Sequence, residues 1–317
     1  LNKKLGALRA RYDAGEVAII EGCGYPAPNR SHFKSMEIWH AGDTRGRASG
    51  DGWIGRMSEA VWEQETDPNR VIHVGGTTPY ALESGVHPAA SFAFAEGYRW
   101  VGTEGNMKAY EEGKSAPGST DSGSTLDALR SAYSAARGSS SAIRKAALGY
   151  RPRVAYPDSG IGLALGTAAA LIQGGIGSRI LSVELKGFDT HNRQVVRHNG
   201  LMQDLDEALS AFHANLKGTP RGDEVTLMAF SEFGRRLAEN GSKGTDHGVA
   251  GPMFVMGKGV RGGLYGKHPS LTELDKGDLV HTTDFRRVYG EVAQSLFGVK
   301  SKALFGKSFP RLGFLPA

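Results

Sequence analysis

Short apolar runs alternate with segments of helical periodicity along most of this chain. Strands are expected over residues 17–20, 70–74, 98–101, 180–185, 225–230 and 252–256. Helices are expected over residues 2–13, 31–40, 53–64, 124–147, 161–172, 201–216 and 284–297. Such alternation builds a largely parallel sheet that helices cover on both faces. The predicted fold class is therefore α/β, a three-layer sandwich with a mostly parallel central sheet.

Length and composition suit one large domain. The chain has 317 residues, of which 39% are hydrophobic and 22% charged, enough for a sizeable core. We therefore predict a single α/β domain over residues 1–317. Residues 114–124, rich in serine and glycine, are expected to form an exposed low-complexity loop within it.

The charge pattern argues against a nucleic-acid partner. The formal net charge of +5 is spread along the chain, without a long Lys/Arg run or a nucleic-acid-binding motif. An ordinary basic surface is the favoured interpretation, and its field would attract an anionic small-molecule or ester substrate. No apolar run approaches the ~20 residues of a membrane span.

Two residues bear on the chain's origin. Cys23 is the only cysteine, so an intrachain disulfide is excluded, although the compartment stays open. No signal peptide is visible, but Leu1 is not a natural start, which leaves room for a processed or trimmed chain. The oligomeric state is not predicted.

Acidic and imidazole side chains lie next to three of the expected strands. Asp189 and His191 follow residues 180–185, Glu232 follows 225–230, and Asp246 and His247 precede 252–256. Open α/β sheets bind ligands beyond their strand ends. Carboxylate oxygen and imidazole nitrogen are ligands for zinc and similar ions. We therefore predict a site for one or two divalent ions, with zinc favoured.

Each of these residues also has a plain structural interpretation. Asp189 can cap the following helix, and Glu232 can pair with a neighbouring arginine. Asp246 can close an Asx-type turn between its flanking glycines, which would leave His247 exposed. The combination of clusters favours the metal site over these separate interpretations.

Ser31 and His32 open the expected helix 31–40 and are the catalytic candidates. Ser31 as a simple N-cap is the structural alternative. As a nucleophile, it would need activation, for instance by a metal, and the helix start would favour a bound phosphate or sulfate.

Three arginines are candidates for binding a substrate anion, namely Arg30, Arg56 and Arg235. A guanidinium group pairs bidentately with phosphate, although each arginine could equally form an ordinary salt bridge. Competing motifs are absent from the sequence: there is no Walker loop, no Gly-x-Ser-x-Gly elbow and no dinucleotide fingerprint after a strand.

Five motifs in order resemble one bacterial family. They are residues 28–33 (PNRSHF), 51–56 (DGWIGR), 187–191 (GFDTH), 231–235 (SEFGR) and 244–248 (GTDHG). As a set they resemble the family called domain of unknown function 1501 (DUF1501), over essentially the whole chain. That family is grouped with the alkaline phosphatase and sulfatase superfamily. Its members commonly carry twin-arginine export signals, so the resemblance implies a periplasmic or extracellular protein.

The superfamily pattern implies roles for particular residues. Ser31 occupies the place of its nucleophile, and Asp189 with His191 fits its first metal. The second metal usually takes an Asp-His pair, where this chain offers only Glu232. His247 fits the last histidine ligand of the superfamily, with Asp246 as a further carboxylate.

The sequence departs from the superfamily in two further ways. The usual first strand, which ends in a metal-binding Asp, is not part of this sequence, so we expect an alkaline-phosphatase-like fold whose first strand is missing. The sulfatase signature Cys-x-Pro-Ser-Arg is also absent, which argues against a formylglycine sulfatase.

Two functions follow as expectations. The first is a metal-dependent hydrolase of phosphate or sulfate esters that uses a serine nucleophile. The alternative is a non-catalytic exported binding protein on the same scaffold, since a fold does not guarantee an activity.

Overall fold

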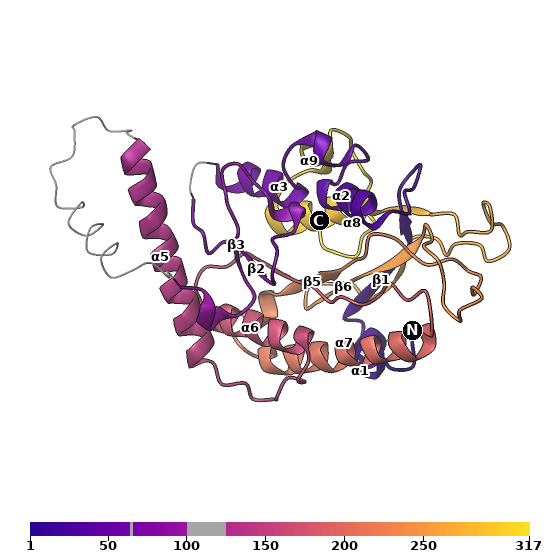
Figure 1. Ribbon diagram of the computed structural model, residues 1–317, viewed down its shortest axis with the longest axis horizontal. Helices are drawn as coiled ribbons and strands as arrows, with labels where there is room; N and C mark the ends of the chain where they lie inside the picture. The colour runs from indigo at the N-terminus through magenta and orange to yellow at the C-terminus, as the bar shows by residue number, and fades with distance from the viewer. Residues whose placement is uncertain (64–65, 100–124) are drawn as a thin grey trace.

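Two layers of helices enclose the β-structure in the computed structural model, which describes residues 1–63, 66–99 and 125–317 (Figure 1). One layer holds α2 (His32–Ala41), α3 (Trp53–Trp62), α8 (Phe285–Phe297) and α9 (Ser301–Phe305). The other holds α1 (Gly6–Asp13), α6 (Gly160–Gly174) and α7 (Gln194–Leu216), with α5 (Thr125–Gly149) beside α6. Short 3₁₀ turns are η1 (Gly46–Ser49), η2 (Tyr80–Leu82), η3 (Ala95–Gly97) and η4 (Gly222–Glu224).

The α/β class is confirmed, and the expected helices are present with ends shifted by a few residues. The largest shift is in α7, which begins at Gln194, seven residues before the first leucine of its apolar stripe at Leu201. The expected loop at 114–124 lies outside the described residues. Among the described helices, none combines the length and the apolar character needed to cross a membrane.

The larger sheet mixes strand directions. Its order is β5 (Thr226–Ala229), β6 (Gly251–Gly257), β1 (Val17–Gly24) and β7 (Gly263–Tyr265), with β8 (Thr283–Asp284) also beside β1. β6 runs antiparallel to both β1 and β5, so the prediction of a mostly parallel central sheet is wrong. The reason is the connection: residues 230–250 contain no helix to carry a crossover, and the chain turns back beside β5.

The smaller sheet is parallel throughout, in the order β3 (Ala90–Phe92), β2 (Val71–Val74), β4 (Ile180–Val183). The strand expected at 98–101 is wrong for its described part, because Tyr98 and Arg99 follow η3 outside any strand. The Tyr98 ring instead packs against Phe92, with centroids 4.9 Å apart. β3 escaped prediction because three residues are too short for a recognisable pattern.

β4 and β5 each lie at one end of their sheet, and side chains of both strands pack against the same two hydrophobic cores. All four positions of each are only half-buried, whereas every position of β2 is buried. Ile180 and Met228 pack against the core under α2, α3 and α8, while Leu181 and Leu227 pack against the core over α1, α6 and α7. Within the described ranges, neither strand has a hydrogen-bonded neighbour on its other side.

The mixed sheet explains why distant segments meet at one end of the molecule. Because β6 is antiparallel to its neighbours, its first residues lie beside the last residues of β1 and β5: Gly251 pairs with Cys23, and Phe254 pairs with Ala229. The segments that follow β1 and β5 and the segment that precedes β6 therefore converge. The loop after β4 joins them through contacts described next.

Candidate metal centre

Three histidines surround the carboxylate of Asp189 at this convergence. Asp189 Oδ1 lies 2.9 Å from Nε2 of both His191 and His247, which are themselves 2.9 Å apart. Asp189 Oδ2 lies 3.3 Å from Nε2 of His32. His32, Asp189 and His247 can each offer a ligand atom within 4.8 Å of the others. Histidines from three separate segments thus face one carboxylate.

The second ring nitrogen of each histidine is held by an acceptor. His247 Nδ1 lies 2.6 Å from the carbonyl oxygen of Arg30. His32 Nδ1 lies 2.7 Å from Glu232 Oε1, and His191 Nδ1 lies 3.1 Å from Asp246 Oδ1. Carbonyl and ionised carboxylate oxygens only accept hydrogen bonds, so each Nδ1–H donates.

With Nδ1–H used in this way, Nε2 is the ring nitrogen of each imidazole that faces Asp189. Lone pairs and carboxylate oxygens at about 3 Å repel one another unless a proton or cation lies among them. Metal-bound histidines almost always donate their other N–H to a carboxylate or carbonyl in this manner. The donor set therefore fits a divalent cation, and its nitrogen and oxygen ligands are those that zinc accepts.

Two glycines allow the loops to approach so closely. A Cβ added at Gly244 would lie 2.2 Å from the carbonyl carbon of His191, and one at Gly248 would lie 2.5 Å from that of Arg235. The close approach allows a backbone hydrogen bond between the two loops, in which Thr245 N–H donates to the Thr190 carbonyl at 3.3 Å. Glycine at these positions is thus a condition for bringing the ligand loops together.

Arg235 also contacts Asp189 at this cluster. Its Nη1 donates to Asp189 Oδ1 at 3.1 Å and its Nε donates to Thr245 Oγ1 at 3.3 Å. Its Nη2 is shielded from solvent and has no hydrogen-bond partner among the described residues. An unused cationic donor beside the cluster is suited to a ligand with anionic oxygens.

The same contacts set the charge of Asp189. Burial acts to raise the pKa of Asp189, but hydrogen bonds from His247 and Arg235, with nearby His191 and His32, outweigh it and hold the pKa well below its ordinary value. The Asp189 carboxylate is therefore ionised at any physiological pH.

The residues of this cluster lie within a segment that one family model matches. The model of the family described as "Protein of unknown function (DUF1501)" matches residues 21–289, which is most of the chain. This chain belongs to the DUF1501 family. No curated protein and no solved structure matches it.

In this DUF1501 protein, all five predicted metal ligands lie together, but in two kinds of position. Asp189, His191 and His247 face one another directly. Glu232 and Asp246 each accept from the Nδ1 of a histidine, so their carboxylates orient imidazoles. His32, predicted as catalytic, has its Nε2 among the potential ligand atoms.

Ser31 lies beside this group without contacting it through its hydroxyl. It is the N-cap residue of α2, and its backbone N–H donates to Asn29 Oδ1 at 2.8 Å. Its side chain does not cap the helix, and no described residue hydrogen-bonds to it. The exposed hydroxyl is therefore not committed to a structural partner.

Two of the three predicted anion-binding arginines have other partners. Arg30 Nη2 lies 2.5 Å from Oδ2 of the buried Asp278, which anchors the segment whose carbonyl holds His247. Arg56 is not brought to the cluster, because its guanidinium donates to the carbonyls of Ala41, Asp51 and Leu304. Only Arg235 of the three combines proximity to Asp189 with an unpaired donor.

Sequence reasoning missed two residues of the cluster. Asn240 donates to the His191 carbonyl at 3.0 Å and to Asp246 Oδ1 at 3.2 Å. Phe233 stacks on the His247 ring with centroids 4.5 Å apart and also packs against His32. Phe233 adjoins Glu232 in the SEFGR motif, a signal that it lay nearby; Asn240 carried no such signal.

Proposed function

We propose that this protein is a metal-dependent hydrolase of phosphate or sulfate esters. The observation that carries the proposal is the orientation of three imidazoles, each held at Nδ1 by an acceptor and directing Nε2 towards Asp189. His32, His191, His247 and Asp189 are the proposed ligands. The two oxygens of Asp189 face different histidines, which supports room for one or two ions.

The surroundings of the cluster support an anionic substrate. α2 begins at His32, so its first backbone N–H groups and the positive end of its dipole lie beside the ligands. Arg235 Nη2 is a further donor for a substrate oxygen. A bound divalent ion would polarise the ester and help to activate a hydroxyl nucleophile.

We assign Ser31 as the nucleophile within this proposal. Its oxygen would form a bond to phosphorus or sulfur while the bond to the leaving alcohol breaks. Ser31 precedes His32 directly and its hydroxyl has no hydrogen-bond partner among the described residues, both of which suit this role. Water would then release the phosphate or sulfate from the serine.

The proposal extends to the scaffold and location. An alkaline-phosphatase-like sheet would have one more strand, and the unpaired edges of β4 and β5, which share two cores, offer a place for it. A parallel strand seated there would end at the metal cluster. We also propose a periplasmic or extracellular location, which rests on the resemblance of the five sequence motifs to a family whose members commonly carry export signals.

Metal analysis tests the central claim. Purified protein is expected to retain one or two zinc ions per chain and to hydrolyse aryl phosphate or sulfate esters, with activity lost in chelator. His247→Ala should lose metal and activity together. His268→Ala is the matched control, because its imidazole is 63% exposed and outside the cluster. Absence of bound divalent ion, together with indifference to chelator, would refute the proposal.

The non-catalytic alternative has one observation in its favour: no described group contacts the Ser31 hydroxyl to activate it. Ser31→Ala separates the two functions. Unchanged ester turnover in this variant excludes Ser31 as nucleophile. A parent protein that binds metal and inorganic phosphate but turns over no ester is instead a binding protein.

A further inference from the structure

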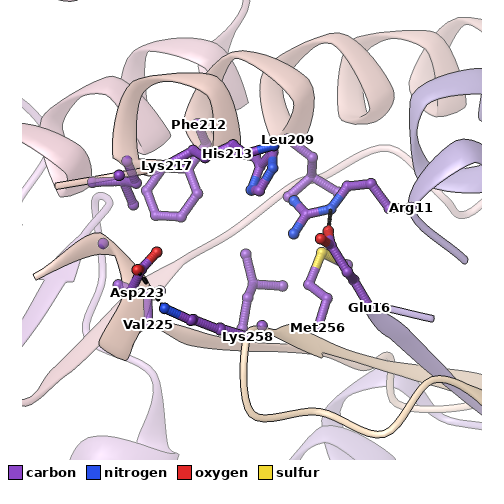
Figure 2. Close-up of a pocket in the computed structure, with 15 residues that line it drawn as sticks. Arg11, Glu16, Leu209, Phe212, His213, Lys217, Asp223, Val225, Met256 and Lys258 are labelled. Atoms are coloured by element: carbon purple, nitrogen blue, oxygen red, sulfur yellow. Dashed lines mark hydrogen bonds and ion pairs between the residues drawn. The ribbon is translucent and has the colours of Figure 1, made fainter. Parts of the chain in front are cut away.

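A cavity lies at the ends of β5 and β6 that are opposite to the metal cluster. It has a volume of about 380 Å³ and lies between α7 and the sheet (Figure 2). Its lining includes Val225, which directly precedes β5, Leu227 of β5 and Met256 near the end of β6, whereas the cluster lies where β5 ends and β6 begins. The volume is within the ~300–1,000 Å³ of small-molecule sites.

The wall of this cavity is apolar. Leu209 and Phe212 of α7 face Met256 on the sheet (Figure 2). Leu216 also lines the cavity, and all four side chains are largely buried. Such a wall favours contact with an apolar part of a ligand. It does not by itself select a ligand, so the selection must come from the charges around it.

The cavity lining holds one more Lys or Arg side chain than it holds carboxylates. Arg11 Nε pairs with Glu16 Oε2 at 3.2 Å, and Lys258 Nζ pairs with Asp223 Oδ2 at 2.7 Å (Figure 2). Both carboxylates of the lining are thereby used. Lys217 also lines the cavity, and no carboxylate of the described residues forms an ion pair with it.

His213 lies on the same side and responds to this positive surplus. It is four residues before Lys217, which directly follows α7, and both residues line the cavity (Figure 2). Burial, and secondarily the charges of Arg11 and Lys217, lower the pKa of His213, against the opposing effect of Glu16 and Asp223. His213 is therefore a neutral hydrogen-bonding group beside the unpaired Lys217.

We propose that this cavity binds an amphipathic monoanion, a carboxylate with an apolar chain such as a medium-chain fatty acid. The chain would lie between α7 and Met256, and the carboxylate would pair with Lys217 and accept a hydrogen bond from His213. The excess positive charge would repel a cationic ligand, and a neutral alcohol would leave Lys217 without an ion-pair partner. The single surplus charge matches one carboxylate.

Calorimetric titration of the full chain with a ligand series tests both parts of the proposal. Each added methylene that enters an apolar wall is worth about 0.8 kcal/mol, or roughly fourfold in affinity. Octanoate should therefore bind roughly ten- to fifteen-fold more tightly than hexanoate. It should also bind more tightly than 1-octanol, which has the same chain without the charge. The titrations are repeated in excess EDTA, so that a carboxylate bound to metal is distinguished.

Charge-reversal variants locate the carboxylate. Lys217→Glu changes an exposed side chain, so folding should be preserved, and octanoate affinity should fall roughly tenfold or more while that of 1-octanol stays the same. Lys302→Glu is the matched control: it makes the same change of net charge at an exposed residue of α9, in the opposite helix layer, and should leave both affinities unaltered.

Three results would overturn the proposal. They are no saturable binding of octanoate at millimolar concentration, equal affinity for octanoate and 1-octanol, and loss of octanoate binding in EDTA or in His247→Ala. The cavity is separate from the metal cluster, so its test does not depend on ester hydrolysis. An inactive protein that still binds octanoate would refute only the hydrolase, and an active one that ignores octanoate would refute only this site.

Discussion

Single residues decide whether the ligand loops can meet, and Gly244 is the sharpest case. A side chain at this position collides with backbone of the loop that carries His191. Gly244→Ala is expected to weaken zinc affinity about 10- to 100-fold, the usual effect of disturbing groups that orient metal ligands. Competition with a zinc-sensitive dye measures it.

The same loop provides the control for that substitution. A Cβ at Gly241 would meet no atom within 4 Å, so Gly241→Ala should leave zinc affinity unaltered. Equal losses in the two variants would show that loop flexibility, and not the close approach at Gly244, governs the site.

His40 gives the protein an acid-sensitive position in α2. Burial lowers the pKa of His40 from its ordinary value near 6.5 to about 4, although the Glu232 carboxylate opposes the shift. Between these two values the unfolded chain binds a proton that the folded chain does not. Stability is therefore full above pH 6.5 and is lost as the pH falls towards 4.

The expected size of this loss is about 3 kcal/mol at pH 4. Urea unfolding at pH 7 and pH 4 measures it for the parent and for His40→Gln, in which the neutral amide does not titrate. The parent should lose more stability than the variant between these pH values. Parallel losses would show that other groups cause the acid sensitivity.

At the scale of elements, the ends of the two sheets differ from their centres. β1 and β2 have hydrogen-bonded strands on both sides, whereas β4 and β5 each have one on a single side among the described residues. Local opening costs less where backbone hydrogen bonds and burial are fewer. Amide hydrogen exchange, read by mass spectrometry, should be faster in β4 and β5 than in β1 and β2. Equal protection of all four strands would contradict this.

The elements also show how far sequence patterns reach. Helical periodicity located the helices, because α7 and α8 keep their apolar stripes over several turns. The apolar residues of β6 do not reveal in which direction the strand runs. The direction depends on the connection that precedes β6, which lacks a helix. The residue types of the metal cluster were predictable because they adjoin strands, as with Asp189 and Glu232. Which of them faces the centre depends on ring-nitrogen partners that only the folded loops define.

At the scale of the whole molecule, the cluster joins segments that are far apart in sequence. His32 belongs to α2, Asp189 follows β4, and His247 precedes β6. A ligand that binds only the folded state stabilises it by about 2.7 kcal/mol at a hundredfold excess over Kd. Zinc should therefore raise the melting temperature of the metal-free protein by roughly 5 °C.

Differential scanning calorimetry with and without zinc measures this stabilisation. His247→Ala should melt at the same temperature in both conditions, while the His268→Ala control should retain the full zinc-dependent rise. A zinc effect that persists in His247→Ala would assign the stabilising ion to another place.

The two oxygens of the Asp189 carboxylate face different histidines, which has a consequence for the order in which two ions would bind. If a first ion draws on one oxygen, the charge left for a second ion on the other oxygen is smaller, and the two cations also repel each other. Loading should then be stepwise and anticooperative, with a tight first equivalent and a weaker second one. If the proposed hydrolysis needs both ions, activity would begin only at the zinc concentration that fills the weaker position, so the zinc concentration would control the turnover.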